Sequence, residues 1–305
     1  MATTINFEEI VNGDVYTFVV GSEQKLYTSV HSAVLSRISE PFAVMLSSGM
    51  KESKDKRVVL LDVDPDTFRL VLEYAYTNFY RPPVVEIKTG RGYHHEEGSE
   101  NPFDTSKDPH FCGFCGSDQW SLFCWPKCKN ASAEVIADKR LQGRTGSEFG
   151  KYLQEMSQGK VPFSDIRLHA RLYIFATKWI MTGLQEMSLH RTHRELANRW
   201  LTEPFEQQLC DTIREVYGNT SAADQESSGI GSEMRELLLT YTFLAQEKLV
   251  KYKEKSPFKA FLLEGGEFLA DFTRKNLEAD ESLRKKRAEA KKERYERWWN
   301  ERKTT

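Results

Sequence analysis

The strongest constraint on the fold is the order of strand and helix signals in residues 14–80. A β-branched and aromatic run, Val15–Val20, ends at Gly21, and a second short run, Leu26–Thr28, follows a polar turn. Together these runs predict a β-hairpin. A further apolar run at residues 58–61 predicts a third strand. Because helix signals separate these strands, the segment predicts an α+β fold, in which a small sheet packs on helices.

The helix signals of this segment are capping residues followed by apolar positions at helical spacing. His31 begins a short helix, and Ser39 caps a second one that has Pro41 in its first turn. Asp64 followed by Pro65 predicts the start of a longer helix. Its apolar face is Phe68, Val71, Leu72, Ala75 and Tyr76.

This segment resembles the BTB/POZ domain in its order of elements and in several short motifs. The matching residues are Gly13-Asp14-Val15, Val30-His31, Leu35, Ser39, Pro41-Phe42, Met50-Lys51-Glu52-Ser53, Leu60 to Asp62 and Tyr74-Ala75-Tyr76-Thr77. The resemblance implies a module for protein association without chemistry of its own. It also implies that the protein forms a homodimer and that it can act as a substrate adaptor of a cullin-type ubiquitin ligase.

The pattern along the whole chain predicts a BTB/POZ domain that is split by an insert. Residues 10–82 hold its first part, 83–160 an aperiodic insert, and 161–190 a helix pair that resembles the one completing the domain. An α-helical extension at 191–280 and a charged basic tail at 281–305 follow. The arrangement after the domain looks most like the BTB proteins of filamentous fungi.

Four residues of the first part match functional positions of the family. Asp14 and His31 match recurrent polar positions near the dimer interface, although a buried histidine and aspartate also suit a satisfied structural pair. Met50 and Glu52 match the apolar-x-acidic element with which some members dock a cullin scaffold. The alternative for Met50 is packing at a helix end, and members that only dimerise carry the same residues.

Cysteines are concentrated in the predicted insert. Cys112 and Cys115 form one close pair, Cys124 and Cys128 form another, and only Cys210 lies elsewhere. Two thiolate pairs can close a tetrahedral site, so the spacing predicts one structural Zn²⁺ that orders a segment with little core of its own. The alternative is a small apolar cluster that buries the thiols among the neighbouring aromatic residues.

The basic tail offers a second functional hypothesis, a zinc-containing nuclear regulator that binds nucleic acid through the insert and the tail. Acidic residues are interleaved with the basic ones, however, and the whole chain carries a net charge of −2. A solvated charged helix is therefore the simpler interpretation, and composition gives no general reason to expect nucleic acid as a partner.

The absence of catalytic motifs and of long apolar runs also bears on the function and location that the sequence predicts. It contains no Gly-rich phosphate loop, no Gly-x-Ser-x-Gly elbow and no His-Glu-x-x-His motif, so we do not expect an enzyme. No apolar run reaches the roughly 18–20 residues that span a bilayer. With an odd number of cysteines and no basic leader, we expect an intracellular protein, in the cytoplasm or nucleus.

Overall fold

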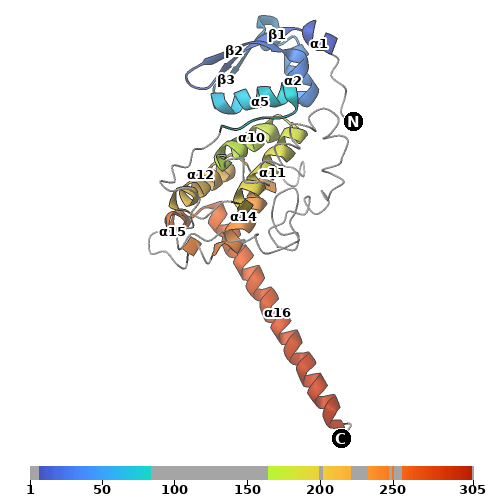
Figure 1. The fold of residues 1–305 in the computed structure, drawn as a ribbon, viewed down its shortest axis with the longest axis vertical. Helices are drawn as coiled ribbons and strands as arrows, with labels where there is room; N and C mark the ends of the chain where they lie inside the picture. Colours follow the sequence, from blue (N-terminus) through green and yellow to red (C-terminus); the bar gives the residue numbers. More distant parts are fainter. Residues whose placement is uncertain are drawn as a thin grey trace.

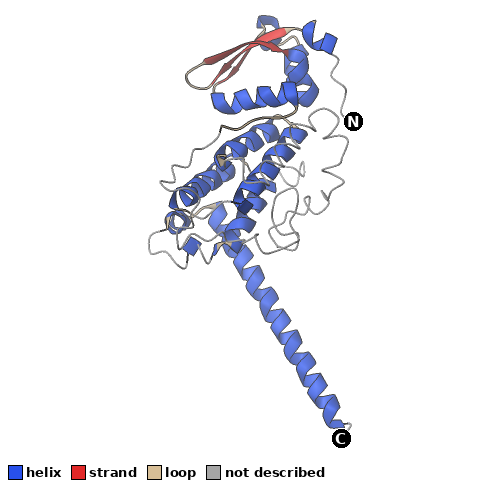
Figure 2. Cartoon of the chain, viewed as in Figure 1, coloured by secondary structure: helices blue, strands red, loops and turns tan. Residues whose placement is uncertain are grey.

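The computed structural model describes residues 7–83, 164–198, 202–220, 233–246, 249–250 and 256–303. The N-terminal elements are α1 (Phe7–Val11), β1 (Val15–Val20), β2 (Lys25–His31), α2 (Ser32–Ile38), α3 (Glu40–Ser47), α4 (Lys51–Asp55), β3 (Arg57–Leu60) and α5 (Pro65–Thr77). The later helices are α10 (Ile166–Lys178), α11 (Thr182–Asn198), α12 (Glu203–Asn219), α14 (Glu233–Leu244), α15 (Pro257–Leu263) and α16 (Glu267–Lys303). The elements lie in two groups along one long axis, with the sheet at one end (Figures 1 and 2).

The three strands form one mixed sheet with the order β2-β1-β3. Strand β1 pairs antiparallel with β2, as the predicted hairpin requires, and parallel with β3. Tyr16, Phe18 and Val20 point to the same face of the sheet, because side chains alternate along a strand. All three are buried in the core that this face forms with the helices. The predicted α+β fold, a small sheet packed on helices, is confirmed.

Side-chain caps begin the helices where the sequence signals them. The Ser39 hydroxyl accepts a hydrogen bond from the Phe42 backbone N–H, and the Asp64 carboxylate accepts one from Thr67. Ser256 caps α15 in the same way. Each cap satisfies a backbone donor that the first helical turn leaves without an internal partner.

The first hydrophobic core joins the sheet and α2, α3 and α5 to helices that come much later in the chain. Phe42 of α3 stacks on Trp179 with ring centroids 4.0 Å apart, and it also faces Phe175 of α10. The Ser39 hydroxyl donates to the Trp179 carbonyl at 2.6 Å. Helices α10 and α11 therefore complete the core of the N-terminal part, although 80 residues separate residue 83 from residue 164.

A second core is purely helical and involves α10, α11, α12, α14, α15 and α16. Arg235 of α14 ties it together at the end of α12. Its guanidinium lies over the Tyr217 ring, donates to the Thr220 hydroxyl at 2.8 Å and pairs with Glu267 of α16 at 2.7 Å. A buried guanidinium held by several acceptors fixes the relative positions of three helices.

Helix α16 changes its surroundings along its length. Phe268 and Phe272 in its first turns are buried in the second core, whereas residues 284, 285 and 288–294 are exposed. The helix then continues as a single rod that leaves the body of the protein (Figure 1). This is the protruding charged helix that the sequence predicts.

Several local predictions needed correction. Strand β3 begins at Arg57, one residue earlier than predicted, and α2 begins after His31, which ends β2. The two five-residue helices α1 and α4 were not predicted.

Candidate interaction surface

An apolar patch lies at the N-terminal end of the sheet. Strand register places Val15 of β1 opposite His31 of β2, and the His31 Nδ1 atom lies 2.8 Å from the hydroxyl of Tyr76 on α5. Helix α1, which precedes β1 and packs on α2, adds two further exposed apolar side chains. We call Phe7, Val11, Val15, His31 and Tyr76 the N-terminal patch.

Three apolar side chains of this patch are largely exposed to solvent. Phe7 is 77% exposed, Val11 55% and Val15 47%. A single exposed apolar residue needs no explanation, but three exposed apolar side chains within nine residues of the chain, next to the start of β1, suit a protein–protein contact. The patch can therefore bury apolar area against a partner.

Asp14 and His31 lie close together at this patch but contact different residues. The exposed Asp14 carboxylate pairs with Lys56 at 2.5 Å, and this hydrogen bond raises the pKa of Lys56 above its usual range. His31 is partly exposed and contacts Tyr76. The alternative of a buried, mutually satisfied His–Asp pair is therefore wrong, and both side chains are accessible to a partner.

Met50 and Glu52 lie at the start of α4. Met50 precedes the helix, and its backbone carbonyl accepts a hydrogen bond from the Ser53 hydroxyl at 2.9 Å. Its side chain is 57% exposed, so it does not pack at the helix end as the simpler interpretation expects. Glu52 is partly buried.

A buried polar network joins the chain after α5 to the start of α10. The His169 Nδ1 atom is 2.9 Å from the Tyr80 hydroxyl, and Nε2 is 2.7 Å from the Ser164 hydroxyl. Ser164 in turn donates to Glu195 at 2.8 Å, and Arg191 donates to the Tyr80 carbonyl at 2.5 Å. We call these five residues the buried clamp, because they join the two ends of segment 84–163.

The buried clamp contains a serine next to a histidine, but its geometry differs from that of a catalytic triad. The carboxylate of Glu195 contacts Ser164, whereas a triad carboxylate orients the second nitrogen of the histidine. Ser164 and His169 are both buried. Cys210 is also buried, which raises the pKa of its thiol to about 12 and keeps it a poor nucleophile.

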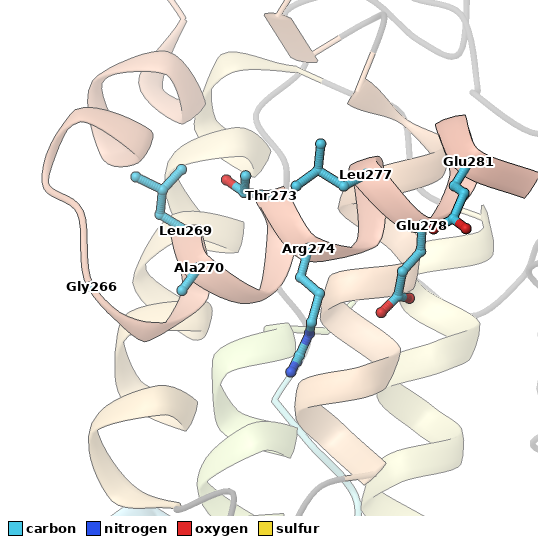
Figure 3. Close-up of a pocket in the computed structure, with 8 residues that line it drawn as sticks. All are labelled: Gly266, Leu269, Ala270, Thr273, Arg274, Leu277, Glu278 and Glu281. Carbon is cyan, nitrogen blue, oxygen red and sulfur yellow. The ribbon is translucent and has the colours of Figure 1, made fainter. Parts of the chain in front are cut away.

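An open groove of about 560 Å³ runs beside the first turns of α16. Its described lining comes from α16 and the preceding Gly266, with Thr273 and Leu277 on one side of the helix and Arg274 and Glu278 on another (Figure 3). Small-molecule sites usually bring polar groups together from several elements. Because its described lining comes from one helix and the residue before it, this groove lacks the converging polar groups of a ligand site.

The predicted zinc ligands Cys112, Cys115, Cys124 and Cys128 lie outside the described residues, so the zinc site stays a prediction. Within the residues that the structure does describe, no group of three or more His, Cys, Asp or Glu side chains could hold a metal ion. In that same part of the chain, every helix is too short or too polar to cross a membrane.

Comparison with known proteins decides the family of the N-terminal part. Residues 12–87 match the family model described as the BTB/POZ domain. This segment is a BTB/POZ domain. The match contains the sheet, helices α2 to α5 and both candidate surfaces except Phe7 and Val11, so these surfaces belong to a BTB domain whose core α10 and α11 help to bury.

A curated relative gives the same result. The chain is 38% identical over 66 residues to Kelch repeat and BTB domain-containing protein 8 of Xenopus tropicalis. The alignment covers 22% of this chain and 11% of that protein, so the two share a BTB domain and little else is compared. The predicted likeness to BTB proteins of filamentous fungi stays a prediction.

Proposed function

We propose that this chain is a non-enzymatic interaction protein whose BTB domain joins two copies of the chain through the N-terminal patch. The single observation that carries the proposal is the exposure of Phe7, Val11 and Val15 beside the end of the sheet. In a symmetric dimer the same patch meets itself, so each buried contact occurs twice. An interface of standard size, about 800 Å² for each partner, needs this kind of apolar centre.

The polar residues around the patch suit a rim. Asp14 and Lys56 form an exposed ion pair of opposite charges at its edge, and His31 and Tyr76 present a ring nitrogen and a hydroxyl beside Val15. Polar groups at the rim of an interface set orientation and specificity more than affinity. Asp14 and His31 are therefore proposed as positioning contacts of the dimer, and the valines as its apolar anchors.

The proposed partner function is that of an adaptor. The exposed Met50 and the neighbouring Glu52 at the start of α4 are proposed as a second contact surface. An apolar anchor next to a carboxylate suits docking of a cullin scaffold, as the resemblance implies. The helical region would then be available to hold a further protein.

Two differently tagged full-length copies, expressed together, test the self-association. Purification through one tag should retain the other in about two-thirds of the dimers that contain the first, because equal amounts of the two copies mix at random. Recovery of one tag alone would contradict the proposal. The adaptor function is tested separately by binding of a purified cullin N-terminal domain, which Met50→Ala should weaken at least tenfold, whereas Val59→Ala, a matched exposed position on β3, should have no effect.

A further inference from the structure

The C-terminal part of α16 has a charge opposite to that of the rest of the chain. Residues 284–303 contain ten basic and four acidic residues, a net charge of +6. The whole chain carries −2, so the remaining residues carry −8. A helix that carries such a local excess of positive charge attracts polyanions, and the body of the protein repels them.

The helical structure separates charges that are interleaved in the sequence. At about 100° of rotation per residue, the exposed cations of residues 284–294 fall within one half of the helix circumference, and the exposed carboxylates fall in the other half. The cations are Arg284, Lys285, Lys291, Lys292 and Arg294. The carboxylates are Glu289 and Glu293.

An ion pair within the helix leaves this face largely intact. Lys285 contacts Glu281 at 2.7 Å, and both side chains are about two-thirds exposed. Such exposed pairs are worth little and exchange readily for another anion. The interleaved carboxylates therefore do not cancel the field of the cationic face, as the sequence alone suggested they would.

The shape of this segment suits a long, linear partner. The segment continues from the body as a single straight helix (Figure 1), and 20 residues span about 30 Å at the usual helical rise. A helix of ordinary diameter, about 10–12 Å, fits the major groove of a nucleic-acid duplex, which is about 12 Å wide in B-DNA. A row of cations along such a helix can contact successive phosphates.

We propose that residues 284–294 of α16 bind the phosphate backbone of double-stranded nucleic acid through this cationic face. An anionic membrane fits less well, because a helix that lies on a membrane needs a continuous apolar face. Ala288 and Ala290 are the apolar residues of the described side chains from 284 to 294, and they point in different directions around the helix. The site acts independently of the BTB dimer, which would place two such helices on one particle.

The test is fluorescence anisotropy of the intact protein with a labelled 25-base-pair duplex of arbitrary sequence, in a titration from 50 to 200 mM salt. If about five cations each replace one counterion, the logarithm of the association constant falls with the logarithm of salt with a slope of about −4.5. The triple variant K291Q/K292Q/R294Q should reduce the steepness of that slope by about 3. The matched variant E289Q/E293Q, on the opposite face, should leave the slope unchanged.

Circular dichroism of each variant establishes that α16 remains helical. The variant R284Q/K285Q removes two further cations and should reduce the steepness of the salt dependence by about 2. Any one of four results would overturn the proposal, and the first three concern binding itself. These are salt-independent or absent duplex binding, equal binding by the wild type and the triple variant, and binding to phosphatidylserine vesicles without binding to the duplex. Docking of the tail on the acidic body of another copy would also overturn it, and would appear as salt-sensitive self-association that K291Q/K292Q/R294Q abolishes.

Discussion

Acid should weaken the fold through His169 of the buried clamp. The Ser164 hydroxyl donates to Glu195, so it must accept the hydrogen bond from His169 Nε2, which leaves Nδ1 to accept from the Tyr80 hydroxyl. The neutral imidazole therefore satisfies every contact in this row. Burial, and secondly the positive charge of Arg191, hold the pKa of His169 well below its usual value.

The direction of the pH effect follows from this shift. As the pH falls below about 6.5, the unfolded chain protonates His169 and the folded chain does not. The unfolded state then binds more protons, so the free energy of unfolding decreases as the pH falls. Between pH 7.5 and pH 5.5 this one group should remove about 1.4 kcal/mol, the free energy that corresponds to one pKa unit.

Urea unfolding of the wild type and of His169→Gln at both pH values isolates this contribution. At pH 7.5 the variant should be less stable by about 1–3 kcal/mol, because the buried hydroxyls of Tyr80 and Ser164 lose well-placed partners. On acidification, however, it should lose about 1.4 kcal/mol less than the wild type. If both proteins lose the same stability, protonation of His169 does not oppose folding and the argument fails.

Three further outcomes are expected. Deleting residues 284–305 should change the melting temperature by less than about 2 °C, because residues 284, 285 and 288–294 are exposed; earlier melting or aggregation would show that the tail supports the body. Replacing residues 84–163 by a short Gly/Ser linker should leave the helix content and cooperative melting of the rest intact, because the buried clamp already joins both ends; loss of cooperative melting would contradict this. Purified protein should contain one zinc ion for each chain, and Cys115→Ser should abolish it while the BTB core still melts cooperatively; metal analysis without stoichiometric zinc would refute the site.

The parts of the fold that could be predicted from the sequence depend on short-range signals. Ser39 and Asp64 cap helices through backbone groups three residues away, so their roles are visible in the sequence. The short helices α1 and α4 were missed because five residues carry too little periodicity to distinguish a helix turn from a loop.

The candidate surfaces could be predicted only in part, because their geometry depends on residues far apart in the chain. The contacts of Asp14 with Lys56 and of His31 with Tyr76 span more than 40 residues. The sequence alone could therefore not show that Asp14 and His31 contact different residues and not each other. The buried clamp was missed entirely, since Tyr80 and His169 are 89 residues apart and a lone histidine on an apolar helix gives no signal of its partner. The cationic face of α16 follows from helical periodicity, and it was missed because the charges were compared along the chain and not around the helix.

Sedimentation equilibrium at 1–50 μM tests the central claim, that two copies meet at the N-terminal patch, most directly. The intact protein should have twice the chain mass of 35.3 kDa at the upper concentrations. Val15→Glu places a charge in the centre of the patch and should give a monomer. Val59→Glu changes a similarly exposed valine on β3 of the same sheet and should remain a dimer. A wild-type monomer, or equal behaviour of the two variants, would contradict the account.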